Sequence, residues 1–139
     1  LLAATVVPTQ VRVAQIGRYH EAVAARVASG DIDVAEQAAN EWRTKFPTDL
    51  LRGELPFWLG VIALEQDRDA DAVRWLTGAV ELGEGSEFEA EARYRLAEAY
   101  RRVGQHDRAR LALESLAESH LDSPFRERAT KELKRERSR

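Results

Sequence analysis

Histidines and clustered carboxylates are the side chains of this sequence that could carry acid–base or metal chemistry. His20, His106 and His120 fall in separate segments, whereas metal ligands normally come as convergent sets. The acidic clusters at 67–71 and 84–91 coincide with expected turns and helix starts, where capping and the helix dipole account for them. Phosphate-loop, zinc-protease and serine-hydrolase motifs are absent. We therefore expect no enzymatic activity, no metal site and no cofactor.

Composition and charge are those of a folded, helix-rich protein of one domain. The chain has 139 residues, of which 44% are hydrophobic and 32% charged, and it has no cysteine, which excludes disulfides. Residues 123–139 carry seven basic and three acidic side chains, a net charge of +4. Because the whole chain carries −3, residues 1–122 carry −7. An acidic body with a basic tail raises the question of what the tail contacts.

The chain opens with an apolar lead-in segment, residues 1–8. It is far shorter than the roughly 18 residues of a membrane span, so we expect no direct membrane insertion. We expect a short helical or extended segment packed on the first helices; the alternative is the end of a longer hydrophobic segment.

Apolar residues at spacings of three and four predict α-helices along the chain, and no strand-type alternation competes with them. Ser86 with Glu89 has the spacing of a capping box, and Ser123 with Pro124 has the pattern of a helix start. A loop or separate turn is expected at 49–53. The expected helices are 9–28, 31–46, 54–66, 69–82, 86–103, 105–120 and one that begins after Ser123.

The pattern repeats with a period of 37 residues. Turn residues recur at this interval, and so do the small residues after them that allow close helix packing. The two sets are Gly30, Asp67 and Gly104, and Ala35, Ala72 and Ala109. A common offset for two kinds of residue indicates stacked helical hairpins. The expected parts are repeats at about 9–49, 50–85 and 86–122, which together span 9–122, and a C-terminal capping helix with a basic tail at 123–139.

Over roughly residues 17–124 the sequence resembles the tetratricopeptide repeat family. That family favours a Leu–Gly or Leu–Ala pair in the first helix of a hairpin, glycine at the turn and alanine early in the second helix. The matching residues are Leu96, Ala97, Tyr100, Gly104, Ala109 and Leu113 in the third repeat, Leu59, Gly60, Ala72, Leu76 and Ala79 in the second, and Gly30, Ala35 and Pro47 in the first. The resemblance implies an all-α fold, a right-handed α-solenoid of three hairpins plus the capping helix.

Two repeat ends, residues 46–49 and 121–124, resemble those of tetratricopeptide proteins of the bacterial cell envelope. This resemblance implies a location in the periplasm or cell envelope, and nothing else in the sequence assigns a compartment. The family's carboxylate clamp is not matched, so recognition of chaperone tails is not expected.

In this family the first helices of the hairpins line a concave groove that binds a partner protein. The positions carried over are His20, Phe57, Val61, Leu64, Tyr94, Glu98, Arg101 and Arg102. His20, Phe57 and Tyr94 stand 37 residues apart and would form a ladder of three rings. The groove would be apolar in repeats 1 and 2 and charged in repeat 3, and would suit a peptide or helix with apolar anchors. In the alternative interpretation, Phe57 and Tyr94 pack against a neighbouring helix, and the lead-in or a flanking region covers the groove.

Three functions remain to be compared. The first is a scaffold that binds a peptide or helix of a partner protein in the groove. The second is an accessory superhelical domain of a larger enzyme or membrane-anchored assembly. The third is nucleic-acid binding through the basic tail; the interleaved Glu127, Glu132 and Glu136 favour an ion-paired helix instead, so no nucleic-acid partner is expected. The three tryptophans lie at helical spacings and are expected in the core, and the oligomeric state stays open.

Overall fold

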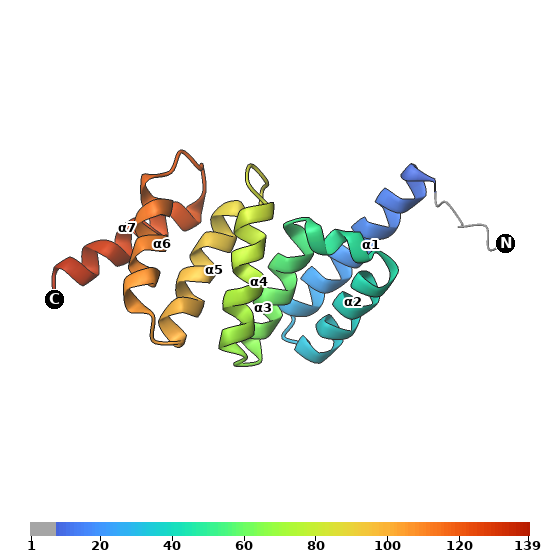
Figure 1. Cartoon of the computed structure of the whole chain (residues 1–139), viewed down its shortest axis with the longest axis horizontal. Helices are drawn as coiled ribbons and strands as arrows, with labels where there is room; N and C mark the ends of the chain where they lie inside the picture. The colour runs from blue at the N-terminus through green and yellow to red at the C-terminus, as the bar shows by residue number, and fades with distance from the viewer. Residues whose placement is uncertain (1–7) are drawn as a thin grey trace.

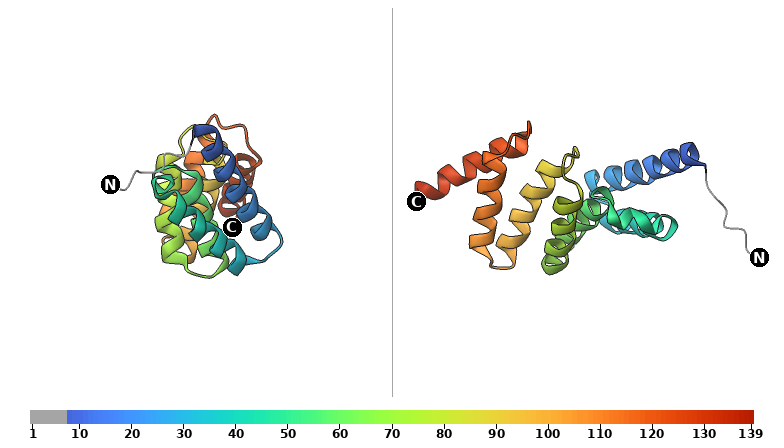
Figure 2. Two further views of the ribbon diagram at one scale, coloured as in Figure 1. Left: turned by 90° about the vertical axis from the view of Figure 1, so that its right-hand side faces the viewer. Right: turned by 45° about the horizontal axis from the view of Figure 1, so that its top comes forward.

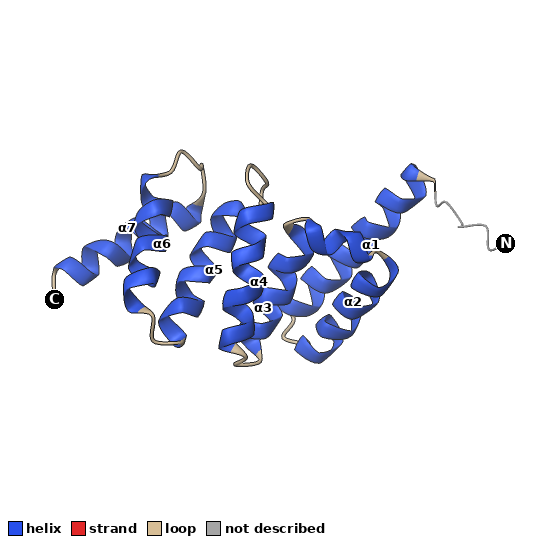
Figure 3. Ribbon diagram, viewed as in Figure 1, coloured by secondary structure: helices blue, strands red, loops and turns tan. Residues whose placement is uncertain are grey.

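The protein is all-α over residues 8–139, which are the residues that this computed structural model describes. The lead-in segment therefore lies, except for Pro8, outside the described residues. Between residues 8 and 139, helices follow one another with no strand (Figure 3). They are α1 (Thr9–Ala28), α2 (Ile32–Lys45), the 3-10 helix η1 (Pro47–Leu51), α3 (Glu54–Glu65), α4 (Asp69–Leu82), α5 (Glu89–Arg102), α6 (His106–Glu118) and α7 (Pro124–Arg137).

Helices that are neighbours in the sequence are also neighbours in space. α1 packs on α2, α3 on α4 and α5 on α6, and a short turn joins each pair (Figure 1). Further contacts join α2 to α3, α4 to α5 and α6 to α7, so the helices follow the long axis of the molecule in chain order (Figure 2). The odd-numbered helices make a second set of contacts, α1 with α3, α3 with α5 and α5 with α7.

The turns within the three helix pairs share one construction. Gly30, Asp67 and Gly104 have φ angles of 81°, 57° and 83°, in the left-handed region that ends a helix. The residue after each turn residue donates its N–H to the carbonyl oxygen five positions earlier, over 2.9 Å in every case. These bonds run from Asp31 to Arg26, from Arg68 to Ala63 and from Gln105 to Tyr100. The turn positions predicted from the 37-residue period are confirmed.

The small residues that follow these turns are buried between the paired helices. Ala35, Ala72 and Ala109 are all buried, as the period predicts. The approach is closest between α3 and α4, where a Cβ added to Gly60 would lie 2.5 Å from Cγ of Leu76. Small side chains at these positions therefore set how near the two helices of a pair can come.

The predicted start of the fifth helix is wrong. α5 begins at Glu89, and the capping box is not formed, because the Ser86 hydroxyl has no hydrogen-bond partner among the described atoms. The carboxylate of Glu89 instead accepts the N–H of Gly85 at 3.3 Å. A close chain crossing explains the difference: a Cβ on Gly53 would lie 2.5 Å from Cα of Gly83, so the chain must turn away from this contact before a helix can begin.

Both other linkers between pairs are ordered by side-chain bonds. Part of the loop expected at 49–53 belongs to η1, whose Asp49 is buried and accepts the indole N–H of Trp42 at 2.9 Å. Arg12 lies 3.5 Å from the same carboxylate, which ties α1 to the α2–η1 junction. The predicted cap of α7 is confirmed, since Ser123 Oγ accepts the N–H of Phe125 at 3.2 Å.

α3 is the centre of the core. Every residue from Leu55 to Leu64 except Trp58 is buried, because α1, α2, α4 and α5 all contact this helix. Its apolar residues therefore surround the helix and do not form a single stripe. Even so, no helix within residues 8–139 combines the length and the apolarity that crossing a bilayer requires.

Two glycines inside helices test the close packing of α3 on α4. Gly60→Ala is expected to lower the free energy of unfolding by about 1–3 kcal/mol, because the new methyl group overlaps Leu76. Gly78→Ala, in α4, meets no atom within 4 Å and is expected to raise it by about 0.5–1 kcal/mol through helix propensity. Urea denaturation measures both; equal effects of the two substitutions would contradict the packing described.

Candidate partner-binding surface

The apolar half of the predicted groove is closed. Phe57, Val61 and Leu64 are 1%, 3% and 3% exposed, so the expectation that they offer open apolar anchors is wrong. The Phe57 ring lies 5.0 Å from that of Trp58 and 5.3 Å from that of Phe88, between ring centroids. For Phe57 the alternative interpretation, packing against neighbouring elements, is what the structure has. The physical reason is that α3 lies between two flanking pairs and is covered from both sides.

The predicted ladder of three rings is not formed either. His20 lies 5.6 Å from both Trp58 and Phe88, so Phe88 connects it to Phe57. Tyr94 belongs to a separate cluster and packs on Phe125 of α7 at 5.5 Å. The structure thus brings His20 and Phe57 into one aromatic cluster and leaves Tyr94 in another.

The charged half of the predicted groove forms a hollow of about 290 Å³ in which α5 residues meet residues of α6 and α7. It is lined by Tyr94, Arg95, Ala97, Glu98, Arg101, Leu113 and Glu132. The Tyr94 hydroxyl donates a hydrogen bond to Glu132, and Arg101 donates to the second oxygen of the same carboxylate at 3.1 Å. Three predicted residues, Tyr94, Glu98 and Arg101, therefore come together here. We call this hollow the α5–α7 site.

Arg102, the last predicted groove residue, mainly fastens the fold. Its guanidinium donates to the carbonyl oxygen of Leu64 at 2.9 Å and to Glu98 at 3.1 Å, and it lies 3.4 Å from Asp69. These bonds connect the end of α5 to the end of α3 and the start of α4. A side chain with so many internal partners has little capacity left for a ligand.

Contacts between consecutive odd-numbered helices repeat in register. His20 with Trp58, Leu64 with Arg102 and Tyr94 with Glu132 are each 38 residues apart in the sequence. The first and third of these contacts are equivalent, because His20 and Tyr94 stand two periods apart. These two contacts between odd-numbered helices are therefore placed by the same period as the turns.

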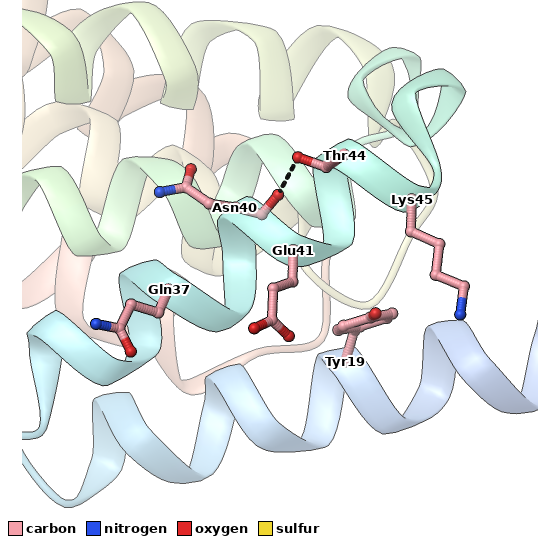
Figure 4. Close-up of a pocket in the computed structure, with 6 residues that line it drawn as sticks. All are labelled: Tyr19, Gln37, Asn40, Glu41, Thr44 and Lys45. Atoms are coloured by element: carbon pink, nitrogen blue, oxygen red, sulfur yellow. Dashed lines mark hydrogen bonds between the residues drawn. The ribbon is translucent and has the colours of Figure 1, made fainter.

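A second hollow, which the sequence analysis missed, lies between α1 and α2. It measures about 560 Å³ and is lined by Tyr19, Gln37, Asn40, Glu41, Thr44 and Lys45. Figure 4 shows the Tyr19 ring beside Glu41 and Lys45, with the Thr44 hydroxyl donating to the Asn40 carbonyl oxygen at 2.8 Å. We call it the α1–α2 groove.

The repeat register contains a signal for a neighbouring hollow of about 300 Å³, which is lined by Gln15, Arg18, Tyr19, Ala22, Ala38, Glu41 and Lys45. Arg18 and Ala22 of α1 are exposed, whereas Leu55 and Leu59, one period later in α3, are buried against α2. The face of α3 that packs on the preceding pair therefore has an uncovered counterpart on α1. A comparison of residue types at equal register positions would have found it.

The basic residues of α7 are not paired as expected. Within residues 8–139 none of its arginines or lysines forms an ion pair, and Glu132 pairs with Arg101 of α5 instead. Arg128 lies over the Phe125 ring at 5.0 Å, and Arg126 donates to the Ser119 carbonyl oxygen at 3.3 Å. The expected ion pairing by Glu127, Glu132 and Glu136 within this helix is therefore wrong. Of the tryptophans, which were expected in the core, Trp42 is buried there, and Trp58 and Trp75 are partly buried against it.

Fold and surface together define an all-α protein of serially packed helix pairs, with one polar hollow between α5, α6 and α7 and one groove between α1 and α2. No protein-family model matches the chain, and no curated protein matches it. Its function must therefore be argued from the residues themselves.

The bond between Tyr94 and Glu132 predicts a dependence of stability on pH. Burial, and then the hydrogen bond to Glu132, raise the pKa of the Tyr94 hydroxyl. The folded state thus holds this proton more tightly than the unfolded chain. The contribution of the protonated Tyr94 hydroxyl to the free energy of unfolding is fully present below the ordinary tyrosine pKa of about 10. This contribution is lost as the pH rises through the higher pKa of the folded state.

Tyr94→Phe should accordingly lower the free energy of unfolding by about 0.5–1 kcal/mol at neutral pH, with a difference from the unaltered chain that shrinks above about pH 10. Urea denaturation across this range measures it. Tyr100→Phe, at a half-buried tyrosine in the neighbouring core cluster, is the control. A difference for Tyr94→Phe that does not change with pH would refute the assignment.

Proposed function

We propose that the protein is a non-enzymatic scaffold that binds a peptide or helix of a partner protein. In this proposal the seven helices form a right-handed α-solenoid of three tetratricopeptide-like hairpins closed by α7. The observation that carries it is the interval of 37 residues shared by the turns and the buried alanines, with one pair of equivalent contacts, His20–Trp58 and Tyr94–Glu132, two such intervals apart. A chain built from equivalent units stacked in one direction gives each unit a repeated inner surface, and such surfaces serve to bind elongated partners. The resemblance of its repeat ends supports a bacterial cell envelope location.

The partner site in this proposal is the α5–α7 site. Its two arginines, Arg95 and Arg101, keep exposed N–H groups beside the carboxylates of Glu98 and Glu132. A partner segment with an acidic side chain next to a basic or hydroxyl side chain could exchange with these pairs without leaving a charge unpaired. Because partly exposed ion pairs each contribute little, affinity from this hollow alone should be modest.

A second function, an accessory domain docked within a larger assembly, is favoured by the α1–α2 groove. That groove adjoins the face of α1 whose counterpart in α3 is covered by the preceding pair, because it shares Tyr19, Glu41 and Lys45 with the hollow beside Arg18 and Ala22. Its side chains are polar but expose more carbon than polar-atom surface, so the occupant would be an amphipathic helix that also forms hydrogen bonds to Asn40, Gln37 and Glu41.

Peptide selection tests the two sites against each other. A phage-displayed random peptide library is panned on the chain, and the affinity of each enriched peptide is measured by fluorescence polarisation. Arg101→Glu should weaken binding about tenfold or more, because it reverses a charge in the α5–α7 site. Arg74→Glu, at a more exposed arginine that pairs with Asp71 within α4, is the control for charge reversal and should have no effect.

Asn40→Arg completes the comparison, since it fills the α1–α2 groove at an exposed position. Loss of binding with Asn40→Arg and not with Arg101→Glu would move the partner site to that groove and favour docking in an assembly. Enriched peptides that bind all three variants equally, with unchanged thermal stability, would refute both sites.

A further inference from the structure

One nitrogen of His20 has two partners with opposite requirements. The indole N–H of Trp58 lies 3.0 Å from His20 Nδ1, and a carboxylate oxygen of Glu54 lies 2.5 Å from the same atom. Indole nitrogen can only donate, so Trp58 needs a lone pair on Nδ1. A carboxylate oxygen at this distance needs a proton between itself and Nδ1. One ring nitrogen cannot meet both needs at once.

Glu54 lies in partly buried surroundings beside other acidic groups. Burial raises the pKa of Glu54; His20 opposes this, while the charges of Glu87 and Asp49 add to it. His20 and Glu54 are both about one-third exposed, with side-chain exposures of 27% and 32%, so solvent can deliver the proton. The acidic groups around the pair thus come from α3 itself, from η1 and from the segment before α5.

The pair also lies at a structural joint. His20 is on α1, whereas Glu54 and Trp58 are on α3, and the ring of Phe88, just before α5, packs on His20. α1 otherwise meets α2 and, through Arg12, the residues Thr48 and Asp49 of η1, and its direct contacts with α3 are few. The bonding state of His20 therefore affects how the first helix pair is held against the second.

We propose that this cluster is a proton-operated joint between the first and second helix pairs. Without the proton, neutral His20 accepts the indole N–H of Trp58 at Nδ1, and the Glu54 carboxylate has no bond to the ring. On uptake of one proton from solvent, Nδ1–H donates to Glu54, and the Trp58 indole N–H loses its acceptor. No other group changes its charge, and the exchange reverses when the proton leaves.

The test follows the indole N–H resonances by ¹H–¹⁵N NMR on the full chain, with Trp58→Phe used for assignment. Between about pH 8 and pH 5, the interval in which histidine changes charge, the Trp58 resonance should move in one step. The step should share its midpoint with the His20 ring resonances. The resonances of Trp42, which is bonded to Asp49, and of Trp75 should not follow it.

Two variants and one control make the outcome decisive. Glu54→Gln removes the charge that stabilises the protonated ring, so the Trp58 step should move to lower pH by about one unit. His20→Asn should abolish the step, and His120→Asn, at an exposed histidine, should leave it unchanged. A Trp58 resonance that stays constant while His20 titrates, or a midpoint unmoved by Glu54→Gln, would overturn the proposal. If His20→Asn does not fold, these two measurements still decide it.

Discussion

The close approach of the two helices within each pair is the constraint on which the rest of the structure depends. A left-handed turn residue reverses the chain, and a buried alanine five residues later lets the second helix lie against the first. Where the facing residue on one helix is large, as Leu76 is, the close approach requires a glycine on the other helix, here Gly60. Because the turn and the alanine keep a fixed distance in the sequence, each pair has the same kind of turn followed by a buried small residue.

The neighbours of each helix decide which of its residues are exposed. α3 contacts α1, α2, α4 and α5, so its residues from Leu55 to Leu64 are buried apart from Trp58, and its apolar side chains stabilise the core. Burying a side chain of the size of Phe57 stabilises the fold by about 1.5–3 kcal/mol relative to leaving it exposed. The helices near the ends keep their polar residues. Both hollows described here are lined by residues of these helices, α5, α6 and α7 for one and α1 and α2 for the other.

The sequence predicted the helices, the turns and the buried small residues, because these follow from local chemistry and a regular period. It did not predict how deeply the side chain at each repeat position is buried. Phe57 and Tyr94 occupy the same place in the repeat, yet one is covered by Trp58 and Phe88 and the other reaches Glu132. Which neighbour covers a residue depends on side chains one repeat away and on linkers such as the segment after Gly83, where a close chain crossing displaced the expected helix start. The period of 37 residues thus predicts where a residue lies in its helix pair, whereas its solvent exposure depends on tertiary packing.

The inner contacts also show how one geometry can carry different chemistry. At equivalent places the protein has a histidine bonded to a tryptophan at one end and a tyrosine bonded to a glutamate at the other. The backbone of the repeat fixes the distance between such partners, so a substitution changes the chemistry of the contact without changing the fold. A contact with a titratable ring responds to pH near neutrality, while one between a phenol and a carboxylate responds only in alkali. The two equivalent contacts thus differ both in their chemistry and in their surroundings, since His20 packs on Trp58 and Phe88 whereas Tyr94 packs on Phe125.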